Sequence, residues 1–470
     1  MQHKMTSMFL SFKDWKKSKE DKIEEWCEEA SVTSSSCLLI KAQMVAISFS
    51  EGFRIPIRLF NNHTMCYDHY ERPRLEEAPA FRVAGFTRYA SELFDRSLLN
   101  NRGVPWNLRF PETQSWNEYD NERRLFWQSR LQSIQRFHQE RHFNEQILSL
   151  PENFGLSAIS TAARGSLVVT SRHKLVHDEE QLHYLINNGC IPKEFETYIA
   201  QLASVRLSLG DSNDTFIMSP DQYSTLGSVY NTNIYLPPGP TPGSIPNAVN
   251  LNHDFESLTE TYFGADFGVV VMDDFLTLET LNALIKFCHE ATIFYEVKGG
   301  FLGAYFYEGL NIDLFLQIED ELRLRMPEIF ADHPLVNLWA YKYDGELGGT
   351  RIHADDAAVN LNFWITPDSA NLDPNNGGLL VYNISAPLDE TIASYNDDSI
   401  EAQKRIESTF LGNTTAMNIP YRQNRAVLFN SNMFHATAPI SFKRGYTNRR
   451  INLTMLFGKR MAHKKRKKKE

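Results

Sequence analysis

Two histidines and one aspartate are the side chains of this sequence whose types and spacing could carry out chemistry together. His353 and Asp355 are separated by one residue, so in an extended strand both leave the same face and can share one metal ion. His435 follows a separate apolar run, 82 residues after His353. Two imidazoles and a carboxylate form the facial triad of non-haem iron sites, which leaves coordination positions open for other ligands and O₂.

A candidate anion-binding strand begins fifteen residues beyond His435. In the run that Arg450 opens, Arg450, Asn452 and Thr454 share one face and apolar residues share the other. A guanidinium pairs bidentately with a carboxylate, so this polar face suits a bound dicarboxylate. The adjacent Arg449 points to the opposite face. We prefer Arg450, because the other register brings the apolar row inside with Arg449, but the sequence leaves that alternative open.

In this order, the motifs resemble those of the Fe(II)- and 2-oxoglutarate-dependent oxygenases, most closely their prolyl-hydroxylase-like branch. That family has H-x-D, a long interval, a second histidine, and then an arginine or lysine, often as R-x-S or R-x-x-x-T. Here Asn452 replaces the serine and Thr454 matches the threonine. Tyr343, in a glycine-containing loop ahead of His353, is similar to the family's tyrosine at that place. The resemblance covers roughly residues 265–458.

The resemblance implies an enzyme that hydroxylates its substrate while converting 2-oxoglutarate and O₂ into succinate and CO₂, with ascorbate as an optional reductant. It implies a peptidyl side chain, such as a prolyl residue, as the substrate, and a small molecule is the alternative. The catalytic residues and ligands of Fe(II) would be His353, Asp355 and His435. The residues that would contact 2-oxoglutarate are Arg450, Tyr343, Thr454 and Asn452.

Two other functions remain open at this stage. One is a non-catalytic jelly-roll scaffold or interaction protein. The other is a cupin-type dioxygenase that does not use 2-oxoglutarate. A protein partner docked on the helical first half of the chain is compatible with the scaffold and with the enzyme.

The second half of the chain predicts many short strands. Between residues 335 and 457, apolar runs alternate with clusters of Gly, Pro, Asn and Asp, which is typical of a sandwich or barrel. Helices are expected over 277–288 and 314–326. The predicted fold class is α+β: a C-terminal double-stranded β-helix (jelly roll) with supporting helices, preceded by a mainly helical N-terminal region. The strands are expected at Leu338 to Tyr343, Val359 to Ile365, Gly378 to Tyr382, Ala426 to Asn430 and Arg450 to Phe457.

Two further features of this half have open interpretations. Asn360, Asn362 and Trp364 alternate along one strand, and they are expected either to contact 2-oxoglutarate or substrate, or to pair structurally. The long connection between Tyr382 and Arg425 has a capping-box pattern at 398–401 and then a short predicted helix. It serves either the substrate entrance or packing.

The first half of the chain predicts helices without recognisable chemistry. An amphipathic helix is expected over 116–148, and a helical hairpin over 178–207 with its turn at 187–192. The acidic run that begins at His177 is interpreted as the start of a helix. The predicted domains are a region of unclear structure at 1–110, a helical region at 111–234, a Pro/Gly-rich linker at 235–260, the jelly-roll domain at 261–458 and a basic tail at 459–470.

Charge limits the classes of partner. The chain has 48 Lys and Arg against 58 Asp and Glu, a net charge of −10, and eight of the cations lie in 459–469. Residues 1–458 therefore hold 40 cations and 57 anions, or −17. A region with this net negative charge repels phosphate, so nucleic acid is expected to bind only at the tail. The tail is a nuclear localisation signal, an RNA-binding arm or a solvated end.

Cysteine usage and hydropathy indicate the compartment. The five cysteines form no C-x-x-C pair, and no run approaches the 18 apolar residues that a membrane span needs. We expect an intracellular protein without membrane contact, cytoplasmic or, through its tail, nuclear.

Overall fold

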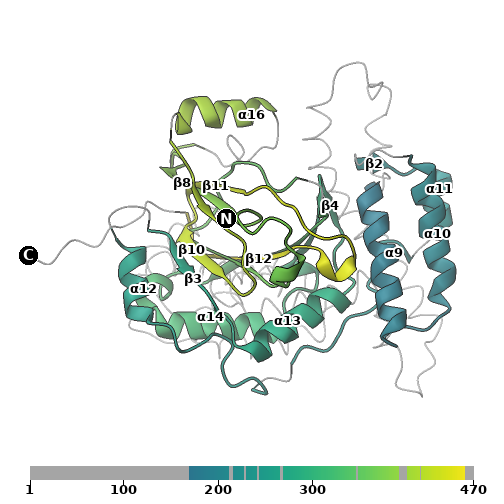
Figure 1. Cartoon of the computed structure of the whole chain (residues 1–470), viewed down its shortest axis with the longest axis horizontal. Helices are drawn as coiled ribbons and strands as arrows, with labels where there is room; N and C mark the ends of the chain where they lie inside the picture. The colour runs from purple at the N-terminus through teal and green to yellow at the C-terminus, as the bar shows by residue number, and fades with distance from the viewer. Residues whose placement is uncertain are drawn as a thin grey trace, which may run out of the picture. The chain divides into compact units, whose positions relative to one another are not determined.

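The structure is a computed structural model in which a seven-stranded and a three-stranded antiparallel sheet are flanked by helices, an α+β arrangement (Figure 1). Predictions for residues 1–168, including the helix over 116–148, and for residues 461–470 of the tail lie outside the described residues. Those residues are 169–210, 215–226, 229–240, 243–264, 268–345, 348–390, 400–412 and 414–460.

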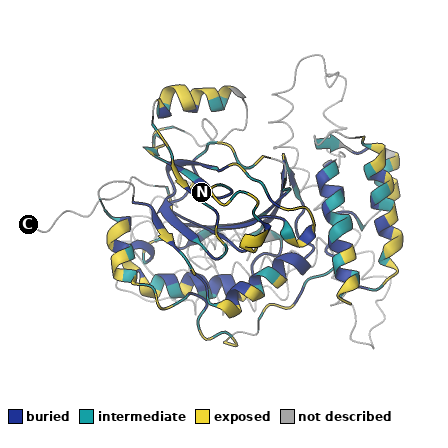
Figure 2. Ribbon diagram, viewed as in Figure 1, coloured by how far each residue is buried: buried dark blue, intermediate teal, exposed yellow. Residues whose placement is uncertain are grey.

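A seven-stranded antiparallel sheet forms the centre of this part of the chain. Its order is β3-β10-β7-β12-β6-β5-β4, so strands that are distant in sequence, such as β7 and β12, lie side by side. Strands β10, β7 and β12 are buried along their whole length, which Figure 2 shows in dark blue. The bounds are β3 (Val270–Met272), β10 (Ala426–Asn430), β7 (Val359–Trp364), β12 (Ile451–Phe457), β6 (Leu335–Tyr343), β5 (Phe301–Tyr305) and β4 (Glu296–Lys298).

A three-stranded antiparallel sheet stands beside the large one. Its order is β11-β8-β9, and its bounds are β11 (Met433–Thr437), β8 (Leu379–Ser385) and β9 (Met417–Ile419). His353, in the segment ahead of β7, forms an isolated antiparallel bridge with His435 and so adds a partner at the β11 edge. Only Ser431 and Asn432 separate β10 from β11, so the two sheets are connected by two residues.

Two helices support the large sheet where the sequence predicts them. Helix α13 (Leu278–Glu290) begins after Thr277, whose hydroxyl accepts a hydrogen bond from the Thr280 amide. Helix α14 (Asp313–Arg325) is bonded to the first residue of β6, because Glu319 accepts from the Leu335 amide at 3.0 Å. The short elements around them are α12 (Phe255–Tyr262), α15 (Pro327–Phe330), and the 3₁₀ turns η5 (Phe306–Glu308), η6 (Asp368–Ala370) and η9 (Tyr446–Asn448).

The predicted helical hairpin is present and packs on the sheet's supporting layer. Gln181 donates to the carbonyls of His289 and Ala291 at 3.2 and 3.0 Å, which joins the first helix to the end of α13. The elements are α9 (Arg172–Asn187), α10 (Phe195–Ser208), α11 (Pro220–Leu226) and a small sheet of β1 (Val169–Ser171) with β2 (Thr215–Ile217).

The start of this hairpin was predicted wrongly. The helix begins at Arg172 and is capped by Ser171, whose hydroxyl accepts from the Lys174 amide. His177 therefore lies inside the helix, fully buried, and its ring packs near Phe294 and Tyr446. Asp178 is hydrogen-bonded to Lys174, one turn earlier in the helix, and to His177. Its carboxylate therefore pairs with neighbouring side chains and does not cap the helix.

The proline-rich stretch behaves as its composition predicts. The described residues between 235 and 247 form no helix or strand. Just beyond them, Glu321 of α14 accepts hydrogen bonds from the amides of Ala248 and Val249.

None of the helices in the described part of the chain is both long and apolar enough to cross a membrane.

A glycine allows the close approach that leads into β8. A Cβ atom on Gly378 would lie 1.9 Å from the carbonyl oxygen of Ile419, the residue of β9 that pairs with Leu379. No side chain fits at that distance without moving the backbone of β9.

The Gly378→Ala variant should therefore lose about 3 kcal/mol of unfolding free energy, since overpacking a tight site forces backbone shifts. Urea unfolding measures this loss. The matched control is Gly299→Ala, where an added Cβ meets nothing within 4 Å. Equal stability of the two variants would contradict the assignment of Gly378 as a steric requirement.

A lysine is buried between the large sheet and its helices. Lys342 of β6 is 1% exposed and donates to the Cys288 carbonyl at 2.9 Å and to the Tyr446 hydroxyl at 3.0 Å. Its Nζ also lies 4.0 Å from the centre of the Phe294 ring. Among the described residues no carboxylate lies within ion-pair distance, and burial lowers the pKa of Lys342 to about 7.

This lysine should make stability depend on pH. In the unfolded chain a lysine has a pKa near 10.4, so between about pH 7 and that value unfolding takes up a proton and the unfolding free energy rises with pH. Denaturation across that window should show this rise in the wild type and a smaller one in Lys342→Met. Replacement of the exposed Lys193 by Met should leave the slope unchanged; a Lys342→Met variant with the full wild-type slope would refute the burial argument.

Candidate metal centre

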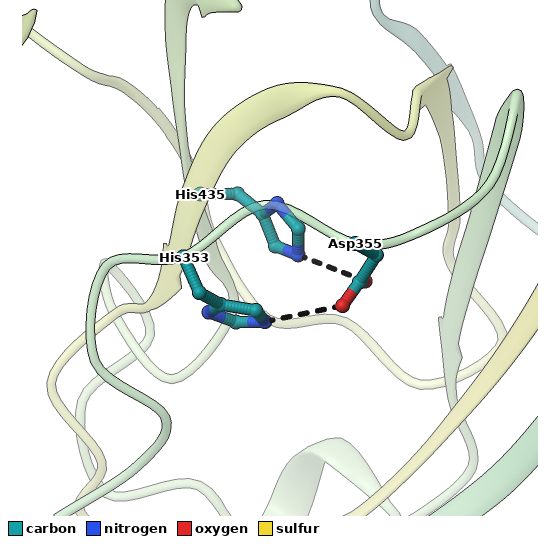
Figure 3. A group of neighbouring side chains, drawn as sticks. All are labelled: His353, Asp355 and His435. Atoms are coloured by element: carbon teal, nitrogen blue, oxygen red, sulfur yellow. Dashed lines mark ion pairs between the residues drawn. The ribbon is translucent and has the colours of Figure 1, made fainter. Parts of the chain in front are cut away.

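His353, Asp355 and His435 point toward one another (Figure 3). One ligand atom from each residue lies within 4.8 Å of the others. Nε2 of His353 is 3.6 Å from Oδ1 of Asp355, and Nε2 of His435 is 3.3 Å from Oδ2. Over the described ranges, this is the one cluster of three or more His, Cys, Asp or Glu side chains that could hold a metal ion.

Main-chain pairing brings the two imidazoles together. The amide of each histidine donates to the carbonyl of the other, at 2.9 and 2.8 Å, and the ring centres are 4.3 Å apart. The Asp355 amide donates to the Ser431 carbonyl, so the segment that carries His353 and Asp355 is also bonded to the connection between β10 and β11. Because side chains alternate along an extended segment, Asp355 reaches the side on which His353 lies.

Hydrogen bonds at the far side of each ring fix the orientation of both histidines. Nδ1 of His353 lies 2.7 Å from the Arg351 carbonyl, and Nδ1 of His435 lies 2.9 Å from the Met433 carbonyl. A carbonyl only accepts, so each Nδ1 carries a proton and each neutral ring turns the lone pair of Nε2 toward Asp355. Acceptors that face one another repel, and either protonation of the rings or a bound cation relieves this. The donor set of two imidazoles and one carboxylate fits Fe(II).

Asp355 is held as a carboxylate in one orientation. Burial raises its pKa, but hydrogen bonding to His435 and Asn360 and the electrostatic influence of His353 and His435 hold that pKa below its usual value. Asn360 donates to Oδ2 of Asp355 at 2.7 Å. The aspartate is therefore ionised and oriented, as a metal ligand must be.

A chain of buried amides extends from Asp355 across the large sheet. Asn362 of β7 donates to the amide oxygen of Asn360. The Asn362 oxygen then accepts from Thr454 at 2.7 Å and from Asn452 at 3.1 Å, both on β12. Strand register places Thr454 opposite Asn362, so these bonds link the aspartate to the polar face of β12.

Arg450 heads that polar face and is almost completely buried. It is 1% exposed, and its Nε donates to the Gly377 carbonyl at 2.6 Å. Its Nη1 is buried without a hydrogen-bond partner, and no ion pair involves Arg450 in the part of the chain that the structure describes. Burial lowers its pKa, while electrostatic interactions with Tyr343 and Tyr421 and hydrogen bonding with Tyr343 act in the opposite direction. A buried cation that lacks a counter-charge is suited to an anionic ligand.

Aromatic rings surround this guanidinium. Its central carbon lies 4.6 Å from the centre of the Tyr343 ring, 5.7 Å from Trp364 and 5.9 Å from Tyr421. The Trp364 Nε1 is also buried without a hydrogen-bond partner. These rings exclude water from the cation, so an anion that reached Arg450 would interact with it strongly.

Arg449 lies elsewhere. Its guanidinium pairs with Glu180 of α9 at 2.9 Å and with Asp344 at 3.6 Å. In this register it is Arg450, not Arg449, that shares a face with Asn452 and Thr454.

The predicted site residues lie in two groups, the three metal ligands and the residues of the polar face headed by Arg450. Tyr343 lies beside Arg450, whereas Asn452 and Thr454 direct their hydrogen bonds to Asn362. Sequence reasoning missed Tyr421 and the Gly377 carbonyl as neighbours of Arg450. The glycine pair ahead of β8 was visible, but its contact with a distant strand depends on how the two sheets face each other.

Comparison with known proteins gives likeness at the level of solved structures only. No protein-family model matches this chain, and a search of curated proteins found no match. The structure matches a prolyl 4-hydroxylase from Pseudomonas putida at 16% identity over 44% of this chain and 99% of that one, with a TM-score of 0.29. It matches the α-ketoglutarate-dependent carbocyclase SnoK from nogalamycin biosynthesis at 11% identity over 45% and 87%, with a TM-score of 0.32.

A third match is HygX from Streptomyces hygroscopicus, solved with nickel, 2-oxoglutarate and hygromycin B, at 12% identity over 41% of this chain and 84% of that one, with a TM-score of 0.28. With identities and TM-scores this low, the functional conclusion depends on the geometry of the site.

Metal binding should be measurable as a gain in thermal stability. A ligand that binds only the folded state raises the melting temperature, so saturating Ni(II), used as an inert divalent ion, should raise it by several degrees. His353→Ala should lose this gain because one of three ligands is gone. His183→Ala, an exposed histidine of α9, is the matched control and should keep it. A nickel-dependent gain that survives in His353→Ala would place the metal somewhere else.

Proposed function

We propose that this protein is an Fe(II)- and 2-oxoglutarate-dependent dioxygenase. We propose further that its two sheets are the halves of a double-stranded β-helix. The observation that supports this best is the combination of a three-ligand centre with a buried guanidinium that has no ion pair among the described residues. The amide chain from Asp355 ends on Thr454 and Asn452, which share the polar strand face that Arg450 heads. An enzyme that binds a metal and a dicarboxylate at once needs both features.

The ligands of Fe(II) are His353, Asp355 and His435 in this proposal. Bound iron would supply the activation of O₂, so that 2-oxoglutarate, O₂ and a C–H bond become succinate, CO₂ and an alcohol. The protein contributes geometry: the Nδ1 hydrogen bonds of both histidines and the Asn360 bond to Asp355 hold three donor atoms toward one point. The facial arrangement leaves the opposite side open for the cosubstrate.

Arg450 is the anchor for the distal carboxylate of 2-oxoglutarate. Its unpaired Nη1 is available to donate, and Tyr343 stands beside it as a neutral neighbour. A carboxylate at this place would offset the cost of burying the cation, which the described residues do not offset with a charge of their own. Asn452 and Thr454 would keep β12 in register and line the path between anchor and metal.

The proposed substrate is a peptidyl side chain, prolyl among them, with a small molecule as the second class, as the family resemblance implies. O₂ is the cosubstrate, with ascorbate as an optional reductant. We further propose an intracellular location, and a protein partner on the helical region.

Removal of the anchor should weaken 2-oxoglutarate binding. Under anaerobic conditions, Fe(II) and 2-oxoglutarate bound together should give a weak visible charge-transfer band, which titration converts into an affinity. Loss of one partner of a buried charge pair costs at least about 2 kcal/mol, so Arg450→Ala should lower that affinity roughly 30-fold or more. The matched control, Arg449→Ala, removes a neighbouring arginine that pairs with Glu180 instead and should bind nearly as the wild type.

Other outcomes of this experiment separate the competing functions. A wild-type protein with neither the band nor succinate production would be a scaffold rather than an enzyme. Oxygen consumption that Arg450→Ala leaves unchanged would indicate a dioxygenase that does not use 2-oxoglutarate. A band that persists in His353→Ala would mean that the metal lies outside the proposed centre.

A further inference from the structure

The segment that carries two of the three ligands is an edge of the small sheet. His353 exchanges both of its main-chain hydrogen bonds with His435 of β11. In an antiparallel pair of this kind, the neighbouring residues turn their N–H and C=O groups the other way. The main-chain groups of Ile352 therefore face away from β11, where a sheet would need another strand.

A glutamine from the long insert takes the place of that missing strand. The Oε1 atom of Gln403 accepts from the Ile352 amide at 3.1 Å, and its Nε2 donates to the Ile352 carbonyl at 2.9 Å. One side chain thus satisfies both main-chain groups of the residue next to His353. Gln403 lies on α16 (Ile400–Arg405), which continues into the π-helical turn η8 (Ile406–Leu411).

The same insert packs behind the ligands. Ile406 and Leu411 of η8 are buried in a cluster with Ala354 and Phe434, and Ile352 packs against it. The Phe410 ring stacks on Phe434 with 5.6 Å between centres. The three residues on the ligand strands, Ile352, Ala354 and Phe434, alternate with the three ligands.

The alternation of side chains along the ligand-bearing segments shows which face of these segments the insert covers. Since neighbours in a strand point to opposite faces, the described part of the insert covers the outer face of the ligand strands, and the metal centre lies on the inner face. Figure 1 shows α16 outside β8 and β11. This part of the insert supports the centre from behind and does not cover its opening.

We propose that the insert helix, α16 with η8, sets the spacing of the metal ligands, and that Gln403 is the positioning residue. The inference rests on the proposed metal centre. Residues 348–358 form no helix or strand, and His353 is held by its bridge to β11 on one side and, through Ile352, by Gln403 on the other. Ligands that are displaced by a fraction of an ångström bind a metal less tightly.

The test is a titration of the apoprotein with Co(II), whose visible bands report both affinity and ligand geometry. Gln403→Leu keeps the size of the side chain and loses both hydrogen bonds, so its affinity should fall roughly tenfold, with altered bands. Gln403→Glu keeps the acceptor for the Ile352 amide but loses the donor, and should lie between Leu and the wild type. Gln423→Leu is the matched control, because Gln423 also donates to a main-chain carbonyl, that of Ile365, away from the ligands.

Hydrogen exchange at the Ile352 amide adds a readout that needs no metal. Exchange should be faster in Gln403→Leu and unchanged in Gln423→Leu. If Gln403→Leu does not fold, Phe410→Leu loosens the stacking on Phe434 while keeping both hydrogen bonds, and should weaken Co(II) binding by a smaller factor.

Gln403→Leu with wild-type affinity and bands would overturn the inference and leave the metal centre intact. Equal losses in Gln403→Leu and Gln423→Leu would overturn it as well, because the effect would then be general destabilisation. A wild-type protein that binds no Co(II) would overturn the proposed function, and this inference with it.

Discussion

Side-chain alternation along antiparallel strands is the constraint on which the rest of this structure depends. On the segment before β7, His353 and Asp355 face inward while Ile352 and Ala354 face the insert. Asn452 and Thr454 of β12 face inward, whereas Lys342, on the neighbouring strand β6, points to the helices. These extended segments therefore carry the chemistry on one face and its support on the other.

Two buried cations, Lys342 and Arg450, occupy opposite faces of the large sheet and differ in whether they can lose their charge. Lys342 lies among rings and main-chain oxygens, and a lysine can lose its proton, so its burial is tolerated without a counter-ion. Arg450 is surrounded similarly, but a guanidinium remains charged at any ordinary pH. A permanent charge with an unbonded Nη1 is costly in the folded protein. That cost is characteristic of a binding site rather than of a packing contact.

Much of this architecture could be predicted from the sequence, and the failures have physical causes. The strands around residues 359–365, 426–430 and 450–457 were visible because apolar runs were bounded by turn residues. Strands β4 and β5, at one end of the large sheet, were missed because they are short and contain charge and glycine, respectively. The helix start at Arg172 was missed because the acidic run that begins at His177 resembles a helix N-terminus, whereas the N-cap is Ser171.

For the site, spacing in the sequence identified the residues but not their mutual contacts. The separation of His353 and Asp355 by one residue predicted a shared face, and the apolar row next to Arg450 predicted which arginine turns inward. The role of Gln403 could not be predicted, since nothing local marks a glutamine that bonds to a strand about fifty residues earlier. Contacts of this kind depend on how an insert folds back over the sheet.

The arginine doublet at the start of β12 has a consequence for strand alignment during folding. A shift by one position would exchange Arg450 for Arg449, so these two residues cannot distinguish the correct alignment from the shifted one. The discrimination falls on the residues that follow: in a shifted strand Leu453 and Met455 would face Asn362, and Asn452 and Thr454 would face apolar helices. The polar side chains of Asn452 and Thr454 thus select the correct alignment of β12.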